Sequence, residues 1–162
     1  MVRTAFITAI ISAYFLIGVP DFLTGGGMFA ALSYPLFHGN VWHLAVNIIA
    51  VWGIYSPRYV CKPCRDLLIP YIISCLVYPL SPRPLLGISN VLYAVLGIRT
   101  PSLSSSWWRQ PPVIVFLVVT ILMLALPQFA GFTHIVSFAT GVLLACASRF
   151  WQNLTRDARR YY

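Results

Sequence analysis

The stretch PLFHGNVWHLAVNIIAVW, residues 35–52, places three polar side chains in a segment that is otherwise apolar. They are His38, His43 and Asn47. A membrane helix tolerates such side chains where they bond to neighbouring helices or face a water-filled cavity, and not where they face lipid. The stretch therefore predicts a membrane helix in which His43 and Asn47, four residues apart, share a face turned away from the lipid, while His38 is offset from His43 by about 140°.

The composition of the whole chain supports a membrane location. Hydrophobic residues make up 59% of the 162 positions and charged residues only 9%, and the mean hydropathy is +0.81. A spanning helix needs roughly 20 apolar residues. The chain can therefore hold about six spans with short connections, and we predict one membrane domain over residues 1–162.

Six apolar segments are predicted to span the membrane, each bounded by proline, glycine or charge. They cover about residues 4–20, 38–56, 67–80, 86–98, 112–128 and 132–150. The first resembles a signal peptide, but no A-x-A site follows it, so we predict a retained helix. The predicted fold is an all-α bundle of six transmembrane helices.

The basic residues predict the orientation of this bundle, because positive side chains are retained on the cytoplasmic side. All of the 11 basic residues except Arg83 lie before the first span, between the second and third, between the fourth and fifth, or at the end of the sixth and beyond it. Both termini are therefore predicted to be cytoplasmic. The net charge of +8 indicates topology and contact with lipid headgroups rather than nucleic-acid binding.

Acidic residues are scarce, and their scarcity excludes several kinds of membrane enzyme. The chain has three, Asp21, Asp66 and Asp157, all in predicted loops or the tail, and it has no glutamate. An aspartyl protease needs two facing carboxylates, an H-E-x-x-H zinc protease needs a glutamate, and proton-coupled transporters commonly use an intramembrane carboxylate. The remaining chemistry must use histidine, serine, asparagine, tyrosine or the backbone.

Two of the four cysteines, Cys61 and Cys64, form a C-x-x-C motif in a loop predicted to be cytoplasmic, where thiols stay reduced. A zinc or redox site needs further ligands, and neither a second C-x-x-C nor a nearby histidine is present. We predict no metal and no cofactor, and keep a zinc or redox role as a minor alternative.

A serine is predicted at the same depth as the histidines. The segment LLGISNVLYAVLG, residues 85–97, starts the fourth span on the outer side and puts Ser89 about one turn into the helix. His38, His43 and His134 lie toward the outer ends of their spans. An adjacent uncharged imidazole can take the proton of a hydroxyl and activate it. The alternative is that the histidines only join helices and that the serine bonds back to the preceding turn.

Three separated motifs resemble the rhomboid family of intramembrane serine proteases. The second span has H-x4-H-x3-N as His38, His43 and Asn47. The fourth has G-x-S as Gly87 and Ser89 with Tyr93 four residues later, and the sixth has HIVSFATG beginning at His134. The resemblance covers nearly the whole chain and implies a rhomboid-like six-helix bundle.

The resemblance implies a catalytic dyad, with Ser89 as the nucleophile and His134 as the base. It implies that the backbone N–H of Ser89 and the side chains of His43 and Asn47 stabilise the oxyanion. Tyr93 would stack on His134, and Gly87 and His38 would support the site. The implied substrates are transmembrane proteins, in a multi-pass enzyme of the bacterial inner (cell) membrane.

The chain departs from the family pattern at several positions. Asn90 replaces the second glycine of G-x-S-G, and it either widens the helix packing or supplies an extra amide. Ser137 replaces a glycine, but Ser137, Gly141 and Ala145 still form a small-residue face that predicts packing against Ala94 and Gly97. The first outer loop, about residues 21–36, is short and lacks the usual Trp-Arg pair.

Two other functions remain open on the sequence. One is a catalytically inactive rhomboid-like protein that binds membrane helices without cutting them. The other is a small channel or transporter lined by histidines, which would predict solute flux and indifference to Ser89→Ala.

Overall fold

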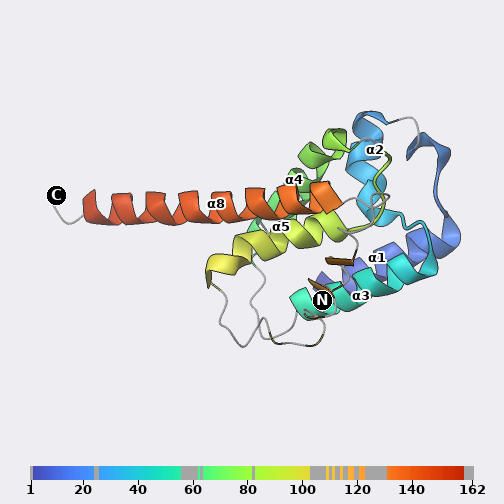
Figure 1. Ribbon diagram of the computed structural model, residues 1–162, viewed down its shortest axis with the longest axis horizontal. Helices are drawn as coiled ribbons and strands as arrows, with labels where there is room; N and C mark the ends of the chain where they lie inside the picture. Colours follow the sequence, from blue (N-terminus) through green and yellow to red (C-terminus); the bar gives the residue numbers. More distant parts are fainter. Residues whose placement is uncertain are drawn as a thin grey trace.

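The computed structural model describes residues 2–23, 26–55, 62, 64–81, 83–102, 109, 111, 114, 117–118, 121–122 and 131–158. Every regular element in these ranges is helical, which confirms the predicted all-α class. The α-helices are α1 (Val2–Leu16), α2 (Gly27–Ser33), α3 (Val41–Ile54), α4 (Ile69–Val77), α5 (Ser89–Arg99) and α8 (Gly131–Ala158) (Figure 1). Most of the predicted fifth span, residues 112–128, lies outside the described residues.

One described helix is long and apolar enough to cross a membrane by itself, over Gly131–Arg156. The apolar parts of α1 and α3 are shorter, at Thr4–Leu16 and Val41–Ile54. Figure 1 shows α8 extending well beyond the other helices toward the C-terminus. The prediction that this helix ends near residue 150 is wrong, because no proline or glycine follows Gly141 to terminate it.

Two helices begin later than predicted, for reasons that are visible in the backbone. Asn40 caps α3, since its side-chain oxygen accepts a hydrogen bond from His43 N–H at 2.9 Å, so His38 precedes the helix instead of starting it. Gly87 has a φ of +86°, which a right-handed helix excludes. α5 therefore starts at Ser89 rather than at residue 86, and this serine is its first residue.

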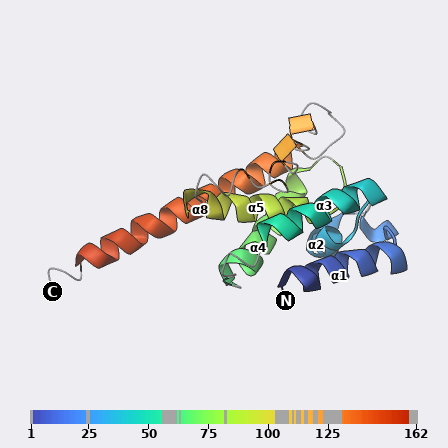
Figure 2. The ribbon, with the colours of Figure 1, turned by 90° about the horizontal axis from the view of Figure 1, so that it is seen from below.

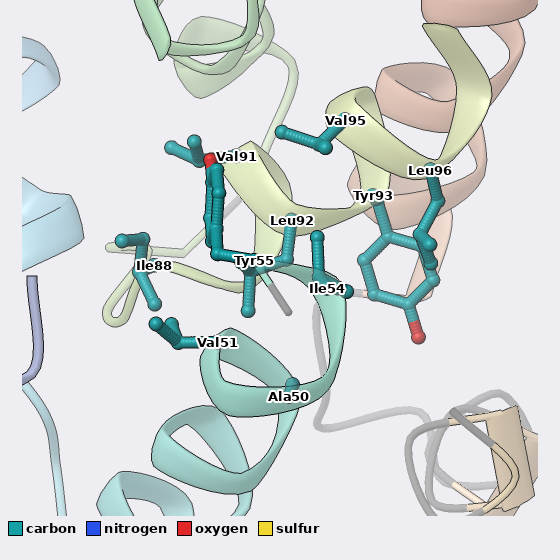
Figure 3. Packing of buried hydrophobic residues seen from close by; sticks show 10 residues of the cluster. All are labelled: Ala50, Val51, Ile54, Tyr55, Ile88, Val91, Leu92, Tyr93, Val95 and Leu96. Carbon is teal, nitrogen blue, oxygen red and sulfur yellow. The ribbon is translucent and has the colours of Figure 1, made fainter. Parts of the chain in front are cut away.

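The central helix is α5, in which every residue is buried. It packs against α3, α4 and α8 (Figure 2). Apolar side chains join it to α3: Val51 and Ile54 of α3 belong to the same buried cluster as Ile88 and Leu92, which Figure 3 shows. Burial of such side chains is the main favourable term that holds helices together outside lipid, and close packing takes over within it.

Glycines allow α5 and α8 to approach until their backbones touch. A β-carbon added to Gly97 would lie 2.1 Å from the carbonyl oxygen of Phe138, and one added to Gly141 would lie 2.5 Å from that of Ala94. Both distances are shorter than van der Waals contact. The predicted packing of the small-residue face of the sixth span against Ala94 and Gly97 is therefore confirmed.

The segment between α1 and α3 is more than a connection. It contains α2, followed by a 3-10 turn at Tyr34–Leu36. Leu23, Tyr34 and Phe37 are buried in a cluster with Tyr78, which follows α4. The Tyr78 hydroxyl donates a hydrogen bond of 3.2 Å to the carbonyl of Leu23.

Asp66 and Arg99 form a buried ion pair at the other end of α5. Asp66 lies in a short π-helix, Cys64–Leu68, that leads into α4, and its carboxylate is 3.3 Å from Arg99 Nε. Asp66 and Arg99 are 0% and 3% exposed, so the expectation that both are loop charges is wrong. Arg99 also donates to the carbonyl of Ile54, which ties the end of α3 to the same pair.

Further donors hold the Asp66 carboxylate in its charged form. The Arg65 guanidinium binds both oxygens, at 2.9 and 3.0 Å, and the backbone N–H of Lys62 donates at 2.8 Å. Burial alone raises the pKa of Asp66, but these hydrogen bonds and the charge of Arg99 outweigh burial and hold that pKa below its ordinary value.

Gly141→Ala is expected to lower the free energy of unfolding by about 1–3 kcal/mol, because the new methyl group meets backbone that cannot move aside. Thermal unfolding of the purified protein in detergent measures the change. Ala147→Leu, at an exposed position of the same helix, is the control. An equal loss in both variants would contradict close packing as the cause.

Asp66→Asn is expected to lower the free energy of unfolding by about 3–5 kcal/mol, because it leaves the buried charge of Arg99 without a carboxylate. Arg83→Gln, at an exposed charged residue, should lower the free energy of unfolding little. The folded-state pKa of Asp66 is lowered, so its contribution is present above the unfolded value of about 3.9 and is lost as the pH falls below it. The free energy of unfolding, measured across pH 3–7, should fall at the acidic end in the wild type and should fall less in Asp66→Asn.

Candidate functional site

Ser89 and His134 lie within hydrogen-bonding distance of each other. Ser89 Oγ is 2.9 Å from His134 Nε2, and both side chains are buried. Ser89 is the first residue of α5, and His134 lies in the first turn of α8. A hydroxyl in this position can pass its proton to a neutral imidazole and become a nucleophile.

Tyr93 holds the imidazole ring from one side. It lies one turn after Ser89 on α5, and its ring stacks on that of His134 with centroids 4.5 Å apart and planes at 20°. His134 Nδ1 is buried, and no described residue bonds to it. Within the described part of the chain, aromatic stacking therefore orients the imidazole in place of a carboxylate.

Gly87 brings the backbone before Ser89 against two polar side chains of α3. A β-carbon at Gly87 would lie 2.8 Å from His43 Nε2 and 3.1 Å from Asn47 Nδ2. Only glycine leaves this space open, and its φ of +86° also favours glycine. His43 and Asn47 thus lie beside the segment of backbone that leads directly to Ser89.

Several N–H groups are available in this region. Asn47 Nδ2 donates to the carbonyl of His43 at 3.1 Å, which uses one of its two amide hydrogens. The Ser89 N–H is in the first turn of α5, where backbone donors have no acceptor within the helix. Such donors, beside a nucleophile, are the groups that can bind a developing oxyanion.

His38 lies beside His43, although it belongs to the segment before α3. Their ring centroids are 5.1 Å apart, with planes at 60°. His38 is buried, and neither of its ring nitrogens bonds to a described residue. It therefore touches the imidazole next to Gly87 and not the Ser89–His134 pair itself.

A polar network next to Ser89 was missed by the sequence reasoning. Asn90 is buried, and its amide donates to the Tyr34 hydroxyl at 3.2 Å, while the Ser137 hydroxyl lies 3.5 Å from its oxygen. Tyr34 also bonds to Ser74 on α4 through its hydroxyl. Asn90 thus supplies an extra amide, and of the two alternatives for this position the structure favours that one.

The backbone of Tyr34 contacts the same region, because its carbonyl accepts the N–H of Gly87 at 3.2 Å. Tyr34 therefore braces both Gly87 and Asn90, on either side of Ser89. A possible sequence signal is the tripeptide Tyr-Pro-Leu, which occurs at residues 34–36 and 78–80 and forms a 3-10 turn in both places.

A cavity of about 670 Å³ lies elsewhere, between α2 and the end of α4, and neither Ser89 nor His134 lines it. Of the C-x-x-C motif, Cys64 is exposed and Cys61 lies outside the described residues. In the ranges that the structure describes, no group of histidine, cysteine and acidic residues could hold a metal ion.

Gly87→Ala is expected to reduce labelling of Ser89 by a fluorophosphonate probe at least about tenfold, since the methyl group would collide with His43 and Asn47 beside the backbone that leads to Ser89. Gly18→Ala is the matched control: Gly18 has a similar φ of +72°, but nothing lies within 4 Å of the added carbon. An equal loss of Ser89 labelling in the two variants would mean that backbone strain, and not the filled space beside His43, is responsible.

Comparison with known proteins supports the family indicated by these motifs. A family model for the rhomboid domain matches residues 25–149, which is more than half of the chain. No curated protein and no solved structure matches the chain significantly. Rhomboid proteins are integral membrane proteins, and most are serine proteases, although inactive members exist. The predicted membership is therefore confirmed, and the chain belongs to the rhomboid family.

Proposed function

We propose that this protein is an intramembrane serine endopeptidase that uses a Ser89–His134 dyad to cut transmembrane segments of other membrane proteins. The observation that carries the proposal is the 2.9 Å distance between Ser89 Oγ and His134 Nε2 in a buried position. Membership of the rhomboid family supports the same reaction class.

In the proposed first step, Ser89 Oγ attacks the carbonyl carbon of a peptide bond while His134 Nε2 takes the hydroxyl proton. The imidazolium then returns that proton to the leaving amine, the C–N bond breaks, and an acyl-enzyme remains. Water, activated by the same imidazole, hydrolyses the ester. Tyr93 keeps the ring aligned through its 4.5 Å stack.

The oxyanion of the tetrahedral intermediate would be bound by the Ser89 N–H and the side chains of His43 and Asn47. Their position around Gly87 supports this role. His38 would support His43, with which it is in ring contact. The steps use only protein groups and water, so the proposal needs no metal or cofactor.

We also propose the topology that the reaction requires. The chain would form one rhomboid-like domain of six spans, with both termini in the cytoplasm and the dyad opening outward. Hydrolysis needs water below the membrane surface, and a cavity enclosed by the helices would supply it. The distribution of basic residues supports this orientation, and the proposed location is a bacterial inner (cell) membrane.

The test is cleavage of a transmembrane rhomboid-type substrate by the purified protein in detergent, followed on gels. The wild type is expected to cut, and Ser89→Ala and His134→Ala should each reduce the rate by at least about 10³-fold, as when a nucleophile or its base is lost. Ser33→Ala is the control, because the only bond of that hydroxyl within the described residues is to the carbonyl of Phe29 in its own helix.

Cleavage that survives Ser89→Ala would contradict the dyad. If the wild type does not cut any substrate, fluorophosphonate labelling of Ser89 decides between the two remaining possibilities. A reactive serine points to a mismatched substrate. An inert one favours the inactive rhomboid-like protein that binds membrane helices.

A further inference from the structure

A second pocket lies at the far end of the α5–α8 pair. It has a volume of about 310 Å³ and is lined by three basic side chains, Lys62, Arg65 and Arg149. We call it the basic pocket. Arg149 follows His134 by 15 residues on one continuous helix, which places it about 22 Å away along the helix axis. The basic pocket is thus separate from the dyad.

The pocket is basic at one end and apolar at the other. α4 and α8 run in opposite directions: Asp66, just before α4, pairs with Arg99 at the end of α5, whereas α8 begins beside the start of α5, where His134 meets Ser89. In the pocket, Arg65 precedes Ile69 by one turn, and Arg149 follows Ala145 by one turn. Both arginines therefore lie at the same end, with apolar side chains one turn deeper on each helix.

The deeper part of the pocket continues this apolar character. Ile98 at the end of α5 and Leu144 on α8 line it together with Ile69. The polar side chains of Ser148 and Gln152 line it alongside Arg149. The arrangement is amphipathic along the direction of the helices, as a phosphate headgroup and the first part of the acyl chains of a phospholipid are.

Two of the three cations are available to a ligand. The third, Arg65, forms an ion pair with Asp66, with 2.9 Å between Arg65 Nε and Asp66 Oδ1. Among the described side chains, neither the Lys62 ammonium nor the Arg149 guanidinium has a carboxylate partner. Clustered cations without counter-charges attract phosphate, and arginine can bind it through two parallel hydrogen bonds.

We propose that the basic pocket binds the phosphate-bearing headgroup of an anionic phospholipid, with the start of its acyl region on Ile69, Ile98 and Leu144. The volume suits a headgroup rather than a whole lipid, since it is near the lower limit of roughly 300 Å³ for ligand pockets. The predicted cytoplasmic side is also the face where anionic lipids attract basic groups. Binding would join the segment before α4 to α8.

The test measures lipid binding to the full chain in a neutral detergent by native mass spectrometry, and it does not depend on proteolysis. Phosphatidylglycerol and phosphatidylcholine with the same acyl chains are titrated separately. Phosphatidylglycerol should bind at least about tenfold more tightly, and raised salt should reduce the difference.

Lys62→Ala and Arg149→Ala should each weaken phosphatidylglycerol binding about fivefold, as expected for one cation near a lipid phosphate. Their melting temperatures should match the wild type, because neither side chain has a bond within the described residues. Arg109→Ala is the matched control, since Arg109 is exposed and does not line the pocket; its binding should be unchanged.

Equal affinity for the two lipids would overturn the proposal. So would a loss of phosphatidylglycerol affinity in Arg109→Ala as large as the loss in Lys62→Ala and Arg149→Ala. Soluble glycerol 3-phosphate provides a further arm. If it binds as tightly as phosphatidylglycerol, the pocket recognises free phosphate and the lipid assignment fails. If it binds much more weakly, the apolar side chains Ile69, Ile98 and Leu144 contribute to lipid binding as proposed.

Discussion

The close approach of α5 and α8 is the constraint on which the rest of the structure depends. Gly97 and Gly141 bring the two backbones into contact, with no room for a β-carbon at either position. Because both helices are rigid over this length, the contact sets their relative depth and rotation. It thereby sets the distance between Ser89, at the start of one helix, and His134, in the first turn of the other. A serine–histidine pair without a carboxylate has to obtain its geometry from packing, and the stacked ring of Tyr93 extends the same packing to the imidazole.

A buried ion pair, Asp66–Arg99, stabilises the end of α5 that lies opposite Ser89. Asp66 and Arg99 are both buried, and around them converge the end of α3, the end of α5 and the segment before α4. A buried ion pair adds little stability compared with apolar packing, but the loss of one partner is expensive. The pair therefore penalises other arrangements of these three segments. Arg65 belongs both to this cluster and to the basic pocket, so a lipid phosphate bound there would lie against the same junction and would connect it to α8.

Asn90 shows how the chain accommodates a departure from the family pattern beside the nucleophile. A larger side chain stands where a glycine is usual, yet α5 and α8 still touch about two turns further along α5, where Gly97 lies close to α8 and Gly141 of α8 lies close to α5. The amide of Asn90 is directed to the Tyr34 hydroxyl, and the Tyr34 backbone binds Gly87. A buried amide is costly unless it is bonded. The segment after α2 satisfies this amide and at the same time braces the residues on both sides of Ser89.

The sequence by itself determined the helical class, the approximate place of the described α-helices other than α2, the family and the motif residues around Ser89; it treated the segment that contains α2 as a loop. It could do so because hydropathy and motif spacing are properties of short stretches. It misplaced the starts of α3 and α5, where the Asn40 cap and the positive φ of Gly87 decide the boundary. It also treated Asp66 and Arg99 as loop charges and did not single out Tyr34. The partners concerned are 33 residues apart for Asp66 and Arg99, and 56 for Tyr34 and Asn90. Only the tertiary structure decided these features, because the burial of a charge and the bonds between distant segments depend on how the helices pack in space.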